Sequence, residues 1–242
     1  MPSKRPLIVN EEVYHVVVRA IENLKLFRNE KDYLRMIHDL FEFNDNNPVS
    51  SVYRHRRVSN VPRSFLGTLE KARGKKRDML VEILAFCLMP NHIHLLLRQK
   101  KDEGISKFMR KLGAGYGLYY NQKYKRSGHL FQGRYKIIHI KDNEQLKIIF
   151  VYIHSNPVLL IIPEWKEKGI EKAKLQEVLK FLENYRWSSY PDYLGKKNFP
   201  SLTNRDFLLQ TIGDLENCQK LIKDWLQFKT ELWEPSKEII IE

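Results

Sequence analysis

The sequence has few cysteines, no long apolar segment and fewer acidic than basic residues. Its two cysteines, Cys87 and Cys218, lie far apart without metal-type spacing, which argues against a disulfide framework and a zinc ribbon. Its longest apolar run, 83–89, is too short to cross a bilayer, and no apolar core follows the N-terminal Met-Pro-Ser-Lys-Arg-Pro. We therefore expect a protein of the reducing cytoplasm without membrane association.

Positive charge is abundant and grouped. Lysine and arginine total 42 against 29 aspartates and glutamates, a formal net charge of +13 over 242 residues. Cations cluster at 54–57, 71–77 and 123–136. Grouped cations favour a polyanion as partner, because neutralising phosphates releases counterions. The basic runs lack the apolar face of a membrane-surface helix, so we expect nucleic acid rather than a lipid surface.

The apolar periodicity predicts an alternation of strands and helices. The predicted order is strand 12–20, helix 30–43, strands 79–89 and 93–98, helix 104–120, strand 134–140 and helix 142–155. This order indicates an α+β fold, a ferredoxin-like antiparallel sheet with helices packed on it. We predict one domain over 1–163 with a basic insertion near 44–77, followed by a helical C-terminal extension over 164–242. The clearest helices of the extension are 170–185 and 206–230.

Helix 104–120 contains three glycines, Gly113, Gly115 and Gly117. Each weakens a helix by roughly 1 kcal/mol relative to alanine. Close approach by DNA or by another helix is one explanation for them. A helix that tolerates small residues for packing is the explanation that we favour.

Residues 90–94 read Pro-Asn-His-Ile-His between two apolar strands. Side chains alternate along a strand, so His92 and His94 project from one face and Ile93 from the other. Two imidazoles aimed at one point can bind a divalent cation. The alternative is a pair of polar residues with hydrogen-bond partners. A metal site also needs a further ligand.

Tyr152 and Asn156 lie four residues apart in helix 142–155, which Asp142 can cap and Pro157 should end. If this helix packs across the sheet, Asn156 can supply an oxygen ligand while Tyr152 stands at a metal-bound phosphate. Histidine nitrogens with an oxygen ligand suit Mg²⁺ or Mn²⁺ chemistry on phosphate esters. Rival nucleophiles on or near the preceding helix are Tyr116, Tyr119, Tyr120 and Tyr124.

The segment 123–136 interleaves cations with aromatic residues and glycines. Cations can hold phosphates while aromatic rings stack on unpaired bases. A solvated hairpin loop is the alternative. The candidate DNA-binding residues are Lys123, Lys125, Arg126, His129, Arg134 and Lys136, together with Arg54, Arg56 and Arg57 of the insertion.

Four short motifs occur in order: Pro-Asn-His-Ile-His-Leu (90–95), Gly-His-Leu-Phe-Gln-Gly-Arg-Tyr (128–135), Tyr-Ile-His-Ser-Asn-Pro-Val (152–158) and Trp-Ser-Ser-Tyr (187–190). With them the chain resembles the REP-associated tyrosine transposases, members of the single-tyrosine HUH transposase superfamily, over roughly 10–195. The resemblance implies an HUH catalytic domain that binds Mg²⁺ or Mn²⁺ through His92, His94 and Asn156. It also implies a single-stranded DNA endonuclease and strand-transferase in which Tyr152 forms a 5′-phosphotyrosine intermediate at hairpin-forming DNA.

Two other functions fit the same residues. One is a noncatalytic nucleic-acid-binding protein on this fold, and the other is a metal-dependent phosphodiesterase that uses water. No general base can be named from the sequence, since His154 projects to a different helical face from Tyr152. We expect a monomer or homodimer that is cytoplasmic and associated with the nucleoid, with single-stranded or hairpin DNA as its partner.

Overall fold

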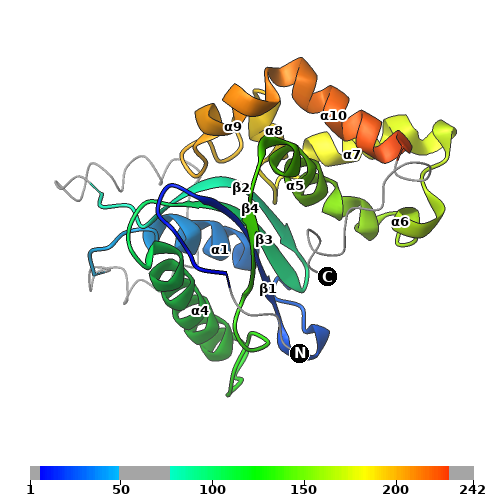
Figure 1. Ribbon diagram of the computed structural model, residues 1–242. Helices are drawn as coiled ribbons and strands as arrows, with labels where there is room; N and C mark the ends of the chain where they lie inside the picture. Colours follow the sequence, from blue (N-terminus) through cyan, green and yellow to red (C-terminus); the bar gives the residue numbers. More distant parts are fainter. Residues whose placement is uncertain (1–5, 49–76, 229–242) are drawn as a thin grey trace.

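The computed structural model describes residues 6–48 and 77–228, and its elements follow the predicted order (Figure 1). The core elements are β1 (Val13–Arg19), α1 (Glu30–Glu42), β2 (Val81–Met89), β3 (His92–Gln99), α4 (Gly104–Lys123), β4 (Lys136–Ile140) and α5 (Asn143–Ser155). The helices that follow are α6 (Trp165–Lys168), α7 (Leu175–Asn184), α8 (Tyr190–Tyr193), α9 (Arg205–Ile212) and α10 (Leu215–Phe228). Most of the predicted basic insertion, with Arg54, Arg56 and Arg57, lies outside the described residues.

The four strands form one antiparallel sheet in the order β2-β3-β1-β4. With α1 following β1 and α4 between β3 and β4, this is the ferredoxin-like arrangement, so the predicted fold class is confirmed. The two central strands are β1 and β3, and their register sets Val17 opposite His94 and Arg19 opposite His92. Residues far apart in the sequence are thereby neighbours on the sheet.

Each face of the sheet has its own apolar core, because side chains alternate along the strands. Tyr14 and Val16 of β1 and Ile93 and Leu95 of β3 pack with α1 and α4. Val13 and Leu96 belong to the other core, with α5 and the helices after it. Figure 1 shows this division, with α1 and α4 on one side of the sheet and α5, α7, α9 and α10 on the other.

The C-terminal helices complete the core over α5. Val178 of α7 and Ile222 of α10 are buried in the same cluster as Phe150 of α5. Residues 187–189 also pair with the edge strand β2, through hydrogen bonds from Leu88 N to Trp187 O at 2.8 Å and from Ser189 N to Phe86 O at 3.0 Å. The described part of the 164–242 extension is therefore joined to the sheet. The domain division at residue 163 stays a prediction.

The predicted helix 206–230 is wrong in one respect, since it is interrupted between α9 and α10. Gly213 ends α9 with φ of 96°, a left-handed conformation that glycine adopts without strain. Asp214 then starts α10, because its side chain accepts a hydrogen bond from Asn217 N at 3.0 Å. The predicted helix 170–185 likewise begins later, as α7 at Leu175, after the 3-10 turn Lys172–Lys174.

The three glycines of α4 have different surroundings. A Cβ on Gly115 would overlap the ring of Phe43, which follows α1, so at this position a small residue serves packing. Gly113 and Gly117 meet nothing closer than 4.0 Å. Among the described residues, each helix is too short or too polar to span a bilayer.

Candidate active site

The histidine pair lies at the start of β3, directly after the two-residue turn Pro90-Asn91 that joins it to β2. His92 and His94 are 8% and 1% exposed, and their ring centroids are 4.8 Å apart. Both face α5, whereas Ile93 packs in the core on the opposite side of the sheet. The alternation predicted from the sequence therefore brings both imidazoles to one face.

Both rings have their Nδ1 atom engaged. His92 Nδ1 lies 2.7 Å from Asn91 Oδ1, and His94 Nδ1 lies 3.1 Å from Nε2 of a third histidine, His15 of β1. An amide oxygen only accepts, so His92 carries its proton on Nδ1 and keeps a lone pair on Nε2. His94 Nε2 is buried and has no hydrogen-bond partner among the described residues. An imidazole whose proton lies on Nδ1 can bind a metal through the lone pair of Nε2.

Burial keeps these imidazoles neutral. Loss of solvent lowers the pKa of His92 to about 3, and the nearby cations Arg19 and Lys166 act in the same direction. Burial lowers the pKa of His94 well below 6.5, with His92 and His15 as further causes. Neutral imidazole is the form that binds a cation, so no proton has to be displaced at neutral pH.

Tyr152 is held opposite the histidines by α5. The helix starts where Asp142 accepts a hydrogen bond from Gln145 N at 2.8 Å, the cap predicted from the sequence. The Tyr152 ring meets His94 edge-on, with centroids 5.6 Å apart and an interplanar angle of 86°. It also lies 5.9 Å from the His15 ring. The predicted nucleophile and the predicted ligand are thus in contact.

The phenol of Tyr152 is enclosed. The residue is 2% exposed, and its Oη makes no hydrogen bond of normal geometry to the described residues. Burial raises the pKa of Tyr152 to about 12, while Arg19 and the Asn156 side chain act in the opposite direction. The phenol is therefore protonated at neutral pH, and a nucleophilic role would require positive charge beside it.

Asn156 follows Tyr152 by one turn and ends α5, as predicted. Its Nδ2 donates to the Tyr152 carbonyl oxygen at 2.8 Å, which orients the amide and leaves Oδ1 as its acceptor. Within residues 6–48 and 77–228, no group of three or more histidine, cysteine, aspartate or glutamate side chains is arranged to hold a metal ion. A cation bound by the two histidines would therefore need an oxygen ligand, such as the Asn156 amide.

Two cations that the sequence analysis missed stand beside these groups. Arg19 is directly across from His92 in the β1–β3 register, and its Nε is buried without a hydrogen-bond partner in the described part of the chain. Lys166 of α6 has its Nζ 5.1 Å from the centroid of the Tyr152 ring. The alternation of strand 12–20 is the signal that could have found Arg19 and His15, since both share a face with Val13.

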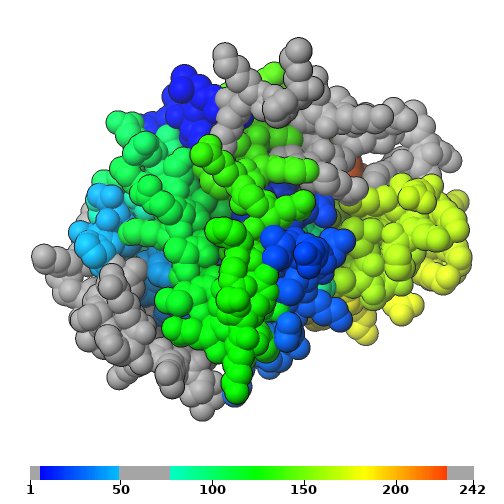
Figure 2. Space-filling model, turned by 90° about the horizontal axis from the view of Figure 1, so that it is seen from below, coloured from blue at the N-terminus to red at the C-terminus, as the bar shows by residue number. Residues whose placement is uncertain are grey.

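The segment 123–136 lies against the end of β1. Ile21 N donates to Leu130 O at 3.0 Å, and Gln132 N donates to Arg19 O at 2.8 Å. Figure 2 shows this green segment beside the blue residues that follow β1. Exposed residues of the segment therefore lie close to the end of the strand that carries Arg19. They include Lys125, His129, Arg134 and Lys136.

Two of the predicted DNA-binding residues are engaged within the protein. Lys123 Nζ lies 2.5 Å from the buried carboxylate of Asp32 and 2.9 Å from Tyr119 Oη, so it ties the end of α4 to the start of α1. Arg126 donates to the carbonyl oxygen of His129 at 2.8 Å and shapes the loop. Both contacts give these cations a structural role.

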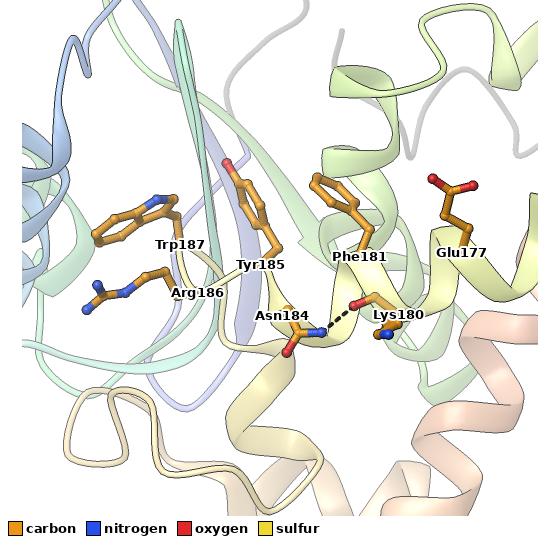
Figure 3. A pocket seen from close by; sticks show the side chains of 7 residues that line it. All are labelled: Glu177, Lys180, Phe181, Asn184, Tyr185, Arg186 and Trp187. Atoms are coloured by element: carbon orange, nitrogen blue, oxygen red, sulfur yellow. Dashed lines mark hydrogen bonds between the residues drawn. The ribbon is translucent and has the colours of Figure 1, made fainter.

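A hollow of about 400 Å³ lies beside α7, as Figure 3 shows, and includes Phe181, Arg186 and Trp187 in its walls. Trp187 is already stacked on Tyr33, with ring centroids 4.5 Å apart, and the Arg186 guanidinium lies 4.6 Å from its ring. Tyr185 Oη donates to the carbonyl oxygen of Leu88 at 2.8 Å. These side chains join α1 and α7 to β2, and the candidate catalytic groups do not line the hollow.

Comparison with known families supports a transposase-like DNA-binding function. More particularly, residues 52–156 match the family model described as "Transposase IS200 like". The matched segment contains His92, His94, Tyr152 and Asn156, and it confirms the resemblance to the tyrosine transposases that the sequence motifs indicate.

The other comparisons add less. No curated protein matches the chain. Among solved structures, one similar chain is described as "Structure of the REP associates tyrosine transposase bound to a REP hairpin", at 14% identity and a TM-score of 0.48. That similarity covers 83% of this chain and 89% of the other.

Proposed function

We propose that this protein is a metal-dependent endonuclease and strand-transferase of single-stranded DNA, of the REP-associated type, that cleaves at hairpin-forming sequences. The observation that carries the proposal is the contact between Tyr152 and the imidazole of His94, on a buried face where Tyr152 Oη and His94 Nε2 both lack hydrogen-bond partners among the described residues. Buried polar atoms are rarely left without partners, so a ligand at this point would satisfy both.

The donor set fits a hard divalent cation. His92 and His94 would hold it through Nε2, and Asn156 would add its amide oxygen. Two nitrogens and an oxygen with open positions suit Mg²⁺ or Mn²⁺. When bound, the cation supplies positive charge at an oxygen of the DNA phosphate.

Tyr152 would attack the scissile phosphorus. A bond forms between its oxygen and phosphorus while the bond from phosphorus to the 3′ oxygen breaks. The phenol loses its proton and the departing 3′ oxygen gains one. The products are a 5′-phosphotyrosine and a free 3′-hydroxyl, and attack by another 3′-hydroxyl reverses the step to join strands without an energy source.

Arg19 and Lys166 supply charge that the buried phenol needs. A guanidinium donates to phosphate oxygens in a fixed geometry, and the Nε of Arg19 is buried without a partner among the described residues. Lys166 stands over the ring of Tyr152. Both cations favour the phenolate over the phenol and favour the phosphate in the same place.

The DNA would reach the site along the segment 123–136. Lys125, His129, Arg134 and Lys136 are exposed on it, and the segment is hydrogen-bonded to the end of β1 beside Arg19. Its cations suit the backbone of single-stranded or hairpin DNA. Arg54, Arg56 and Arg57 stay predicted DNA contacts outside the described residues. We place this activity at the nucleoid of the cytoplasm, in a monomer or homodimer.

Covalent trapping tests the proposal. The full chain is incubated with labelled hairpin DNA and Mn²⁺, then separated under denaturing conditions. We expect a protein–DNA adduct that is absent for Tyr152→Phe and for His94→Ala. Tyr33→Phe is the matched control, because the Tyr33 ring stacks on Phe27 and Trp187 and packs against the core on the opposite face of the sheet.

The two other functions give different results in this assay. A noncatalytic binding protein would retain hairpin DNA under native conditions and form no adduct. A phosphodiesterase that uses water would cut the DNA without an adduct, and Tyr152→Phe would cut it equally well. Either result would contradict the proposal.

A further inference from the structure

His15 is a polar residue at the centre of the sheet that the proposed reaction does not yet use. It lies in the middle of β1, between Leu96 of β3 and Ile138 of β4 in the strand registers, and it is 0% exposed. Its Nε2 is 3.1 Å from His94 Nδ1, and the two rings stack at 5.3 Å with an interplanar angle of 13°. A buried imidazole is costly unless it is hydrogen-bonded, and this contact engages one of the two ring nitrogens, since Nδ1 has no hydrogen-bond partner among the described residues.

The bond between the two rings holds one proton, and its position decides what His94 offers to the site. If His15 Nε2 carries the proton, His94 Nδ1 accepts it and His94 Nε2 must then be an N–H, which cannot bind a cation. If His94 Nδ1 carries the proton, His94 Nε2 is a lone pair. Only the second arrangement gives the buried Nε2 a role as a ligand.

We propose that His15 is a positioning residue that accepts the proton of His94 Nδ1, and so fixes the ring and the tautomer that present His94 Nε2 to a divalent cation. The inference rests on the proposed role of His94 as a ligand. Asn91 Oδ1 accepts the proton of His92 Nδ1 in the same way, at 2.7 Å. Each of the two candidate ligands thus has its own acceptor behind it, the arrangement that orients metal-binding histidines.

His15 acts through His94 and does not touch DNA. It is fully buried between two strands and below the Tyr152 ring, whose centroid lies 5.9 Å away. The expected effect of removing it is therefore on cation affinity and on the tautomer of His94, with DNA affinity retained.

Three variants of the full chain separate this role from simple packing. His15→Leu replaces the imidazole with an apolar side chain of similar size and so removes the Nε2 acceptor. His15→Gln places an amide oxygen near the position of Nε2 and restores it. His139→Gln is the matched control, because His139 lies on the neighbouring strand β4 and contacts Glu12, away from the site. Far-ultraviolet circular dichroism in EDTA checks that each variant is folded.

The first measurement is Mn²⁺ affinity of the DNA-free protein, followed by electron paramagnetic resonance. We expect His15→Leu to weaken binding by about 10-fold to 100-fold, the range for loss of a group that orients a ligand. We expect His15→Gln to recover most of that loss and His139→Gln to match wild type. Equal affinity of folded His15→Leu and wild type overturns the inference. If His94→Ala also retains wild-type affinity, the proposed metal site fails and the inference fails with it.

The second measurement needs no metal. Long-range ¹H–¹⁵N spectra of histidine-labelled protein in EDTA report which ring nitrogen of His94 carries the proton. We expect Nδ1–H in wild type and in His15→Gln, and a shift toward Nε2–H in His15→Leu. A wild-type His94 protonated on Nε2 overturns the inference, even where the covalent adduct with DNA forms as proposed.

Discussion

Four buried histidines should make this fold sensitive to mild acid. Burial lowers the pKa of His15, His92 and His154 to about 3 each, and that of His94 well below 6.5. In the unfolded chain each returns to its ordinary value of about 6.5. The unfolded state therefore binds protons first as the pH falls. The buried neutral histidines therefore cost no stability above about pH 6.5, and the free energy of unfolding falls progressively from there toward pH 3.

The size of the effect follows from the difference in histidine pKa between the folded and the unfolded state. At pH 5.5, one unit below the ordinary pKa, each histidine that stays neutral in the fold costs about 1.4 kcal/mol of stability. Four of them lower the free energy of unfolding by about 5 kcal/mol relative to pH 7.5. Because whole domains are stable by only about 5 to 15 kcal/mol, we expect unfolding to begin in this range.

Urea denaturation in EDTA, followed by circular dichroism at pH 7.5, 6.5 and 5.5, measures the loss. His154→Gln should reduce it by about one quarter, roughly 1.4 kcal/mol at pH 5.5, because one of the four groups is removed. His154 is the best choice because its ring bonds Ser189 at 2.7 Å, away from the proposed ligands. A free energy of unfolding that differs by less than about 1 kcal/mol between pH 7.5 and 5.5 would refute the reasoning.

Three further perturbations have defined outcomes. Ser189→Ala removes the hydroxyl that bonds the β2 main chain and the buried His154 of α5. It should lower the free energy of unfolding, measured by urea denaturation, by about 2 to 4 kcal/mol. The neighbouring Ser188→Ala should lower it by about 1 kcal/mol. Gly104→Ala would push a Cβ into the main chain just before β2 and lower the melting temperature. A Cβ at Gly117 would make only an ordinary contact with Leu130 at 4.0 Å, so Gly117→Ala should raise stability by about 0.5 to 1 kcal/mol; the reverse order would contradict the packing. Arg19→Gln should slow adduct formation in single-turnover assays on the order of 100-fold, with partial rescue by Lys, and an unchanged rate would remove Arg19 from the mechanism.

Local periodicity in the sequence was sufficient to predict the order of strands and helices. It also predicted how part of the candidate site is arranged. The period of two around Ile93 put His92 and His94 on one face, and the helical period put Asn156 one turn after Tyr152. Both patterns are set by backbone geometry within a few residues, so the side-chain directions that they predict are those found in the folded protein. The order of strands and helices then restricted the sheet to few topologies.

The other half of the site depends on pairing between distant segments. His15 and Arg19 share a face of β1, yet only the β1–β3 register brings them to His94 and His92. Which side of an alternating strand faces α5 is decided by packing across the sheet and leaves no local pattern. Lys123 shows the same limit, since its ion-pair partner Asp32 lies 91 positions away in the sequence and no local pattern predicts the pair.

Burial has opposite consequences for the two kinds of group in this site. It keeps His92 and His94 neutral, which favours binding of a cation, but it also raises the pKa of Tyr152 to about 12 and so suppresses the proposed nucleophile. A more exposed site would ease ionisation of the phenol and weaken the orientation of the ligands. Positive charge resolves the conflict, because Arg19 opposes the rise for the phenol while disfavouring protonation of His92. We infer that an apolar enclosure with a cation at its edge is what allows neutral ligands and a tyrosine nucleophile to share one face of the sheet.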